Sequence, residues 1–575
     1  MKTNFLKILL FVSPAILGLF FKALFKEYKV DLLINLFIET VLYLFLFPLL
    51  FSNIIKTYYL KKIVLRMVVI ISGVSIFFES LYYYLYGANV GPSTLYFILQ
   101  TNENETFEFL QNNIDVVMIG FTFCYFVSFY SSLKMIPKLI EYLSSIKLRS
   151  DKIFIYGYGI FSVVLLSYIY YFDIINYNLP YLASRSIIEH YKFTDDFEDL
   201  GFKNKNGHFK KTTHNNQTTN QETYVIVIGE STTKNRMQLY GYAKETSPNL
   251  SEIQDDLFIF DDVISPHVGT ILSLGKVLTT NDAEQNSKKN IQNLGELLEG
   301  KGYKKLNTKV GSIVQLFNLA GFKTFWLSNQ RPMGIHENLV TEISKAADTS
   351  EFINIANFDE VTPYDHELLP IYEKALKDPA NKKVIFLHLL GTHMHYEYRY
   401  PIDFDYFKTE NITLLEKFIS KKQHNKYMGI KYDNAIRYND YLLREVIEKV
   451  KNTNSSSYVL FFSDHGEELN PPKNNPVGHY FEERTASMYE IPFVVWLSPK
   501  FRENKNISYC LTNKFMTDNL IHAISDLSSI SYEGLDLSKS IFSKHFKERS
   551  RIIMQNKDFD NYFYSSQFRN SLTKK

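Results

Sequence analysis

Several residues that commonly bind metals follow apolar runs of this sequence at the points where those runs end. The run Val225–Ile228 is followed by Gly229 and then by Glu230, which is typical of a buried strand that opens into a loop. Similar runs lead to imidazole and carboxylate side chains at His388, His393, Asp464, His465 and, after a short interval, His479. Parallel strands bring their carboxyl ends to one edge of a sheet, so we expect these side chains to cluster there. Such ligands suit zinc, with manganese as an alternative.

Thr270 is the candidate nucleophile. It follows Gly269 and precedes an apolar helical pattern in the stretch HVGTILSLGKVL. A hydroxyl at the start of a helix lies near backbone N–H groups that bind phosphate and near the positive end of the helix dipole. Threonine alone is a poor nucleophile, and a coordinated divalent cation would lower the pKa of its hydroxyl. From spacing alone, a simple helix-capping threonine is the favoured interpretation.

The elements that must position these groups alternate between strands and helices. Residues 431–450 have the apolar spacing of a helix, and apolar runs typical of strands lie at 224–230, 322–330, 383–393, 458–468 and 491–498. This alternation predicts an α/β domain over residues 223–575, with a mostly parallel central sheet covered by helices. Residues 173–222 are expected to form a bridging or linker segment. Within it, 203–222 is almost free of apolar side chains, so His208 and His214 are expected to be solvated.

The N-terminal part is far more apolar and predicts a helical membrane domain over residues 1–172. A bilayer is crossed by about 20 apolar residues, and five segments satisfy this: 4–24, 31–52, 63–83, 114–133 and 153–172. Lysines and arginines gather in the second and fourth connecting loops, whereas residues 84–113 contain none. The positive-inside rule then places the N-terminus in the cytoplasm and everything after residue 172 outside.

Composition excludes two further classes of interpretation. The formal net charge of +2 over 575 residues gives no reason to expect binding to nucleic acid. Cys124 and Cys510 are the two cysteines of the sequence, and they lie on opposite sides of the predicted membrane boundary. The outer domain is therefore expected to depend on its apolar core instead of disulfides.

The ordered motifs resemble those of a known family. They are GESTTKNRMQLYGYAKETSPNL, HVGTILSL, LHLLGTHMHYEYRYP, YDNAIRYND, SDHGEEL and GHYFEE, and they follow the apolar segments. The set is similar to that of the lipid-dependent phosphoethanolamine transferases, which are inner-membrane members of the alkaline phosphatase and sulfatase superfamily. The chain departs from many of those proteins by having no cysteines for bracing disulfides. A sulfatase proper is disfavoured because no Cys-x-Pro-x-Arg segment is present.

The resemblance implies roles for particular residues. It implies that Glu230, Thr270, Asp464 and His465 hold one zinc ion, with Thr270 as the nucleophile that becomes phosphorylated. His393 and His479 match residues that hold a second metal or the substrate. Polar positions matched to donor binding are Asn329, Thr101, Asn102, Glu105 and His388.

The implied reaction moves phosphoethanolamine from phosphatidylethanolamine to a cell-envelope acceptor and releases diacylglycerol. Lipopolysaccharide, at lipid A or the inner core, is the expected acceptor, while glucans and protein threonines stay open. The enzyme is expected to act as a monomer in the inner membrane, with its catalytic domain in the periplasm. The rival interpretations are a phosphoglycerol transferase of the lipoteichoic acid synthase type and an inactive membrane receptor or scaffold.

Overall fold

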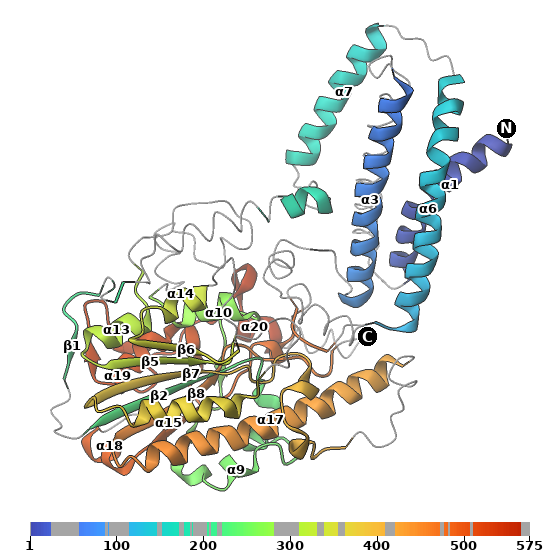
Figure 1. Ribbon diagram of the computed structural model, residues 1–575. Helices are drawn as coiled ribbons and strands as arrows, with labels where there is room; N and C mark the ends of the chain where they lie inside the picture. The colour runs from blue at the N-terminus through green and yellow to red at the C-terminus, as the bar shows by residue number, and fades with distance from the viewer. Residues whose placement is uncertain are drawn as a thin grey trace. The chain divides into compact units, whose positions relative to one another are not determined.

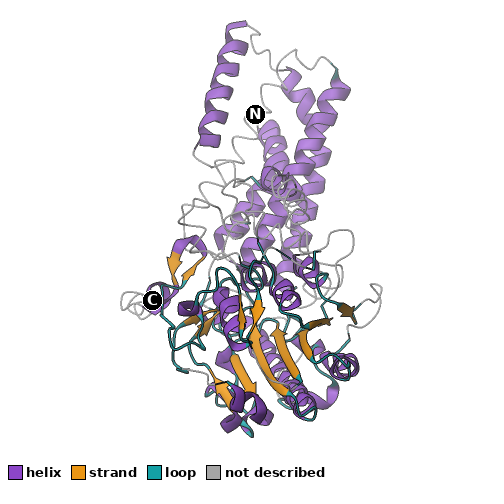
Figure 2. Ribbon diagram, turned by 90° about the vertical axis from the view of Figure 1, so that its left-hand side faces the viewer, coloured by secondary structure: helices purple, strands orange, loops and turns teal. Residues whose placement is uncertain are grey.

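The computed structural model divides the chain into two compact units, one built mainly from residues before Tyr191 and the other mainly from those after it (Figure 1). Apart from a few isolated positions, it describes residues 2–24, 57–86, 114–145, 152–171, 178–184, 209–215, 221–280, 310–330, 339–354, 363–408, 420–471, 477–480, 484–505 and 510–564. The strands drawn in Figure 2 all belong to the second unit, and the first unit is helical.

Among the described residues of the first unit, three helices are long and apolar enough to cross a membrane. They are α1 (Lys2–Leu24), α3 (Tyr58–Tyr86) and α6 (Val116–Ser145). A fourth helix, α7 (Lys152–Tyr171), covers the predicted fifth span, and its described apolar stretch is the shorter Gly159–Ile169. The predicted span 31–52 lies outside the described residues. Four of the five predicted spans are therefore helical, three of them meet the membrane-crossing criterion, and a five-span domain is not confirmed.

Helices α1, α3 and α6 pack on one another through apolar and aromatic side chains. Phe21 of α1 stacks on Phe121 of α6 with ring centroids 3.9 Å apart, and Phe77 of α3 lies 5.3 Å from Tyr125. Large apolar side chains such as Phe123 and Phe78 stay exposed on the outside of these helices. An apolar outer surface of this kind suits a helix that meets lipid.

The second unit is built on a seven-stranded sheet. In spatial order its strands are β3 (Leu257–Ile259), β9 (Phe493–Leu497), β8 (Ser456–Ser463), β2 (Glu222–Gly229), β7 (Lys382–His388), β5 (Lys323–Ser328) and β6 (Thr349–Phe352). All five predicted strands are confirmed. Strands β8, β2, β7, β5 and β6 are mutually parallel, whereas β9 runs antiparallel to both β8 and β3. The sheet is therefore mixed, and the prediction of a mostly parallel sheet holds for its centre.

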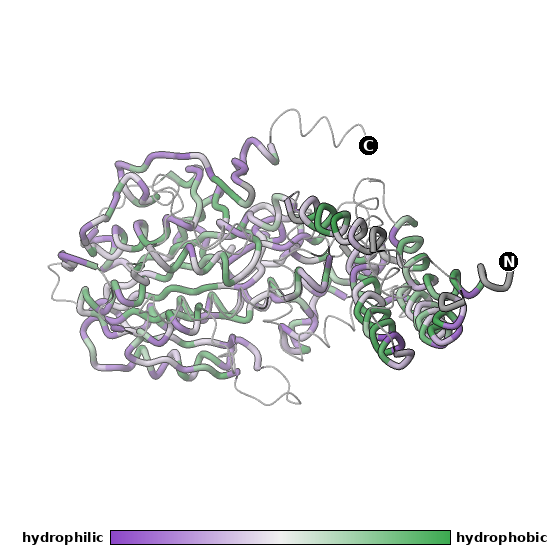
Figure 3. The backbone as a smooth tube through the Cα atoms, turned by 90° about the horizontal axis from the view of Figure 1, so that it is seen from above, coloured by the Kyte–Doolittle hydropathy of each residue, from purple (hydrophilic) through white to green (hydrophobic). Residues whose placement is uncertain are grey.

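Helices cover both faces of this sheet (Figure 1). On one face, Leu442 and Val446 of α17 (Lys421–Lys451) pack with Tyr372 of α15 (Leu369–Leu376) against strand residues such as Ile385. The next strand residue, Phe386, points to the other face and lies 6.1 Å from Phe317 of α13 (Ile313–Leu319). Both faces of the central strands are thus buried, in keeping with their hydrophobic colouring in Figure 3.

Smaller elements complete the second unit. The short strand pairs are β1 (Thr213–His214) with β11 (Ile530–Ser531), β4 (Val263–Ile264) with β10 (Phe515–Met516), and β12 (Ile552–Ile553) with β13 (Lys557–Asp558). The shorter helices are α9 (Pro248–Ser251), α10 (Thr270–Val277), α14 (Leu339–Ser344), α18 (Pro499–Asn504), α19 (Leu520–Leu527) and α20 (Phe559–Tyr564).

The expectation that His214 is solvated is wrong. Its side chain is 3% exposed, and its Nε2 lies 3.2 Å from Glu222 Oε2 while its Nδ1 lies 2.7 Å from Lys382 Nζ. Strand β1 brings it there by pairing with β11. A segment poor in apolar residues can still be ordered when its polar side chains meet charged partners at the start of the sheet. His208 lies outside the described residues.

Candidate active site

The register of two neighbouring parallel strands sets the position of the metal-binding candidates. Gly229 at the end of β2 is paired with Ser463 at the end of β8, so the next residues, Glu230 and Asp464, leave the sheet side by side. The Asp464 backbone N–H also donates to the Gly229 carbonyl at 3.0 Å, which extends the pairing by one step. The expectation that strand ends gather these carboxylates is confirmed for this pair.

Thr270 completes the cluster from the first position of α10. Its Oγ1 lies 3.0 and 3.2 Å from the two carboxylate oxygens of Glu230 and 3.4 Å from His465 Nε2. His465 Nε2 in turn lies 3.3 Å from Glu230 Oε1 and 3.5 Å from Asp464 Oδ2. The structure therefore brings together the four side chains that the family resemblance assigns to one metal site.

Two carboxylates share this space without a matching positive charge from His465. Burial first, and then the neighbouring Glu230 carboxylate, raise the pKa of Asp464 to about 8. Burial likewise raises the pKa of Glu230, although hydrogen bonds from its neighbours oppose the shift. Burial lowers the pKa of His465, so its imidazole is neutral and able to bind a metal. A divalent cation would remove the repulsion between the carboxylates.

The free atoms of the cluster fit such an ion. Asp464 Oδ1 accepts the backbone N–H groups of Ser231 (3.0 Å) and His465 (2.7 Å), while the buried Oδ2 has no hydrogen-bond partner within the described part of the chain. One ligand atom from each of Glu230, Asp464 and His465 lies within 4.8 Å of the others. His465 Nδ1 is 2.9 Å from the Gly466 carbonyl, an outer contact that directs Nε2 towards the carboxylates.

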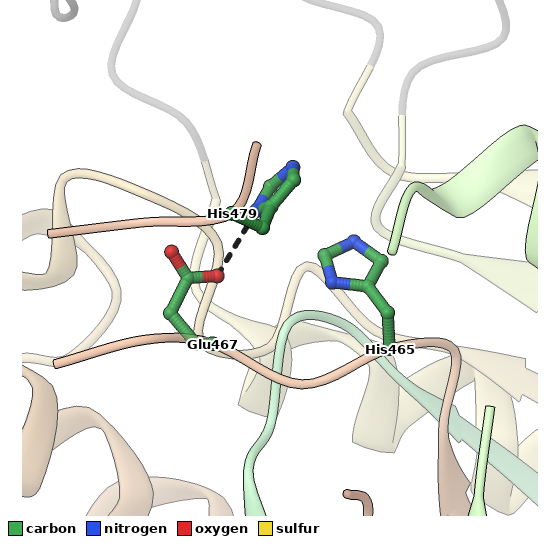
Figure 4. Close-up of side chains that lie close together, drawn as sticks. All are labelled: His465, Glu467 and His479. Carbon is green, nitrogen blue, oxygen red and sulfur yellow. Dashed lines mark hydrogen bonds and ion pairs between the residues drawn. The ribbon is translucent and has the colours of Figure 1, made fainter. Parts of the chain in front are cut away.

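A second group of ligand atoms adjoins the first and includes a residue that sequence reasoning missed. His465, Glu467 and His479 each offer a ligand atom within 4.8 Å of the others. Figure 4 shows their side chains together, with His479 Nδ1 3.1 Å from Glu467 Oε2. Burial alone would lower the pKa of His479, but Glu467 and the other nearby carboxylates outweigh it and raise the value. The available signal was the position of Glu467 two residues after His465 in SDHGEEL.

His393 lies near this second group without joining it among the described residues. Its pKa is lowered well below the usual range by burial first, then by Arg399 and then by His479. The imidazole is therefore neutral and could bind a metal or a phosphoryl oxygen. Its assignment to a second metal or to substrate stays a prediction.

Of the predicted donor-binding residues, the structure describes Asn329 and His388, and their printed contacts lie outside the metal cluster. Asn329 is fully buried, and its amide donates to the Pro363 carbonyl (2.9 Å) and to Asp365 (2.8 Å). His388 is buried beside Trp326, and burial lowers its pKa to about 3. Thr101, Asn102 and Glu105 lie outside the described residues, so their role in donor binding stays a prediction.

Gln330, the residue after Asn329, reaches the metal cluster. Its Nε2 is 3.4 Å from Glu230 Oε2 and donates to the Leu389 carbonyl at 3.1 Å. Adjacent residues at the end of β5 point in different directions, so Gln330 contacts Glu230 whereas Asn329 contacts Asp365. The role of Asn329 in donor binding stays a prediction.

Comparisons with known proteins agree with this geometry. Residues 222–530 match the family model described as Sulfatase. Phosphoethanolamine transferase EptC of Escherichia coli O18:K1:H7 (strain RS218 / NMEC) is 30% identical over 523 residues, which cover 85% of this chain and 84% of that protein.

Two solved structures are similar as well. The C-terminal periplasmic domain of EcEptC from Escherichia coli, in complex with Zn, is 31% identical with a TM-score of 0.54, and the match covers 63% of this chain and 99% of that one. The integral membrane protein lipooligosaccharide phosphoethanolamine transferase A (EptA) from Neisseria meningitidis is 18% identical with a TM-score of 0.61, over 93% of this chain and 97% of that one. The second likeness extends the shared fold to the helical unit. The chain therefore belongs to the sulfatase family and, within it, to the phosphoethanolamine transferases, which are enzymes.

Proposed function

We propose that this enzyme transfers phosphoethanolamine from phosphatidylethanolamine to an envelope glycolipid through a covalent intermediate on Thr270. The observation that carries the proposal is the contact of Thr270 Oγ1 with both Glu230 (3.0 Å) and His465 (3.4 Å) at the start of a helix. A hydroxyl used only as a helix cap would accept a backbone N–H of the first turn, whereas Thr270 donates to a buried carboxylate. This arrangement favours the nucleophile over the capping interpretation.

In the first displacement, Thr270 Oγ1 attacks phosphorus and gives its proton to Glu230, the acceptor of its hydrogen bond. The new bond joins Oγ1 to phosphorus, and the bond from phosphorus to the diacylglycerol oxygen breaks. His479, which Glu467 orients through the 3.1 Å contact at Nδ1, is placed to supply the proton that the leaving oxygen needs. Diacylglycerol leaves, and phosphoethanolamine stays on Thr270.

In the second displacement, an acceptor hydroxyl or phosphate oxygen attacks the same phosphorus from the vacated side. His479 takes the proton of an attacking hydroxyl, and Thr270 Oγ1 leaves and regains its proton from Glu230. Zinc held by Glu230, Asp464, His465 and Thr270 would lower the pKa of the threonine hydroxyl and neutralise charge on the phosphoryl oxygens. The side chains are therefore arranged for double displacement, with acid and base roles exchanged between the two steps.

The likeness and the apolar helices support the proposed acceptor and location. The Neisseria relative is a lipooligosaccharide phosphoethanolamine transferase, which supports a lipopolysaccharide-type acceptor here. Three helices long enough to cross a membrane support an inner-membrane location, with the catalytic unit on the periplasmic side. Thr101, Asn102 and Glu105 are proposed contacts for the ammonium group of the donor.

Mass spectrometry of the Thr270 peptide tests the proposal. The full chain, loaded with zinc in vesicles of phosphatidylethanolamine and without acceptor, should accumulate a phosphoethanolamine group on Thr270. Vesicles of phosphatidylglycerol provide the control and should leave Thr270 unmodified. A phosphoglycerol adduct in the control would favour the lipoteichoic acid synthase interpretation. Absence of any adduct in both vesicles would contradict the proposed intermediate.

A further inference from the structure

The segment Leu389–Thr392, here called the 389–392 turn, lies directly against the backbone of Glu230. Gly391 has a φ of +59°, and a Cβ at this position would stand 2.7 Å from Glu230 N and 2.8 Å from its carbonyl oxygen. Thr392 donates to the Glu230 carbonyl from both its backbone N–H and its hydroxyl, each at 3.0 Å. The position of Glu230 beside Thr270 therefore depends on where this turn is held.

One buried carboxylate holds the turn. Asp365, the first residue of the short helix η5 (Asp365–Leu368), is 3% exposed. Its Oδ1 accepts the Leu390 N–H at 2.9 Å, and its Oδ2 accepts the Gly391 N–H at 2.8 Å. Two consecutive backbone donors on the two oxygens of one carboxylate fix both the place and the orientation of the peptide plane between them.

Asn329 fixes the carboxylate in turn. Its Nδ2 donates to Asp365 Oδ1 at 2.8 Å and to the Pro363 carbonyl at 2.9 Å, and its backbone N–H donates to the His388 carbonyl at 2.9 Å. The residue thus ties the end of β5 to the end of β7 and to the segment that carries Asp365. The linkage satisfies the amide nitrogen of the fully buried Asn329, and none of these partners belongs to the metal cluster.

We infer that Asp365 and Asn329 are positioning residues that set Glu230 for zinc binding and for its contact with Thr270. The chain of contacts runs from Asn329 to Asp365, from Asp365 to the 389–392 turn, and from the turn to Glu230. The inference rests on the proposed function, since it assigns this linkage to the same site. His393 follows the turn directly, so the linkage also fixes the start of the segment that carries this imidazole.

The substitution Asp365→Asn tests the inference with almost no change in side-chain volume. An asparagine has one acceptor oxygen, so its NH2 group would face the N–H of Leu390 or Gly391, and the turn would lose one of its two anchors. Zinc affinity, measured with zinc alone against a fluorescent chelator, should fall by about tenfold or more, the usual effect of losing a contact behind a metal ligand. The kcat should fall with it, while KM for phosphatidylethanolamine should change little.

Tyr372→Phe is the matched control. It removes a buried hydrogen bond of 3.1 Å from Tyr372 of α15 to the Val446 carbonyl of α17, away from the metal cluster. This variant should lower the Tm of the metal-free protein and leave zinc affinity unchanged. If Asp365→Asn matched the control in both readouts, or kept wild-type zinc affinity and kcat, the inference would be overturned.

A second variant covers the case in which Asp365→Asn does not fold. Asn329→Ala removes one of the three donors to Asp365 and keeps both backbone anchors, so zinc affinity should fall a few-fold. Wild-type zinc affinity in this variant would overturn the inference as well. Zinc affinity requires neither donor nor acceptor, so a failure to detect the Thr270 adduct would contradict the proposed function and leave this result standing.

Discussion

Buried charges are handled in opposite ways in the two units. In the helical unit, Lys22 of α1 and Glu79 of α3 face each other at 2.8 Å, with side chains only 3% and 8% exposed. At the carboxyl edge of the sheet, Glu230 and Asp464 are both buried beside His465, whose imidazole is neutral. The first pair is neutralised within the protein, whereas the second consists of two carboxyl groups that repel each other when both are ionised.

The difference distinguishes a structural contact from a binding site. A buried ion pair satisfies its own charges and links two helices. In the same unit, the hydroxyls of Ser75 and Ser80 donate hydrogen bonds to carbonyls of their own helix. Two buried carboxylates with oxygens within 4.8 Å of each other are unfavourable unless a proton or a cation joins them. The sheet edge is therefore built for a group that the polypeptide does not itself provide.

The largest expected effect is on transfer. Thr270→Ala should reduce transfer by about a thousandfold or more, as removal of a nucleophile does in covalent catalysis. Thr270→Ser, which keeps the hydroxyl, is the matched control and should retain measurable turnover. The assay follows labelled phosphoethanolamine from vesicles to lipopolysaccharide. Transfer by the alanine variant near the wild-type rate would show that Thr270 is only a helix cap.

The next prediction tests whether Asp464 binds the metal or is an ordinary structural carboxylate. Asp464→Asn should lower zinc affinity and activity together by about a hundredfold, because the ion loses one of its two carboxylates. The same change removes the repulsion from Glu230, so the metal-free variant should melt no lower than the wild type. Calorimetry with and without zinc measures both quantities. A large loss of stability in the metal-free variant, with zinc affinity unchanged, would make Asp464 a structural residue.

A smaller effect concerns pH. The pKa of Asp464 is raised to about 8 by burial and by Glu230, so the metal-free cluster holds a proton below that pH. Zinc binds the ionised form, and its affinity should rise by up to about tenfold per unit between pH 6 and 8 and then level off. Chelator competition across this range, corrected for the chelator, gives the slope. A zinc affinity that does not change with pH would contradict the presence of this proton in the metal-free cluster.

The stability of the metal-free protein should depend on pH in the opposite direction from its zinc affinity. The ordinary pKa of an aspartate is 3.8, so between about pH 4 and pH 8 the folded state holds a proton that the unfolded chain has released. This carboxyl therefore favours folding less as pH rises through that window. Measuring Tm against pH for the wild type and for Asp464→Asn isolates the contribution of Asp464 from those of the histidines.

The smallest expected effect on catalysis comes from the helical unit. Lys22→Met leaves Glu79 buried without its partner and should destabilise the packing of α1 on α3 by about 3 kcal/mol. Adding Glu79→Gln, which removes the second charge, should recover most of that loss. Zinc affinity should be unchanged in both variants. A thermal shift in detergent checks this, and lower zinc affinity after Lys22→Met would break the distinction between the two regions.

The strands and the ligand cluster could be predicted because they depend on local patterns. Continuous apolar runs mark strands that are buried on both faces, and the residue types at their ends identify Glu230, Asp464 and His465. The reversed direction of β9 could not be predicted, since an apolar run does not encode its own polarity. Strands β3 and β6 have three and four residues, too short for a periodic signal.

The contacts between side chains were harder to predict from the sequence than the positions of the strands. Glu467 lies two residues after His465, but its grouping with His479 is a tertiary contact that this short spacing does not itself reveal. Asn329 and Gln330 are neighbours in sequence, yet one is buried in the linkage to Asp365 and the other reaches Glu230. A motif match locates the loop, and the direction of each side chain is fixed only by the packing around it.

Anomalous X-ray scattering at the zinc edge, on crystals of the full chain grown with zinc, is the most direct test of the central claim. The account predicts a peak within bonding distance of Glu230, Asp464, His465 and Thr270 Oγ1, which should disappear in Asp464→Asn crystals. Absence of zinc between Glu230 and Asp464, with these side chains ordered and the ion bound elsewhere, would contradict it.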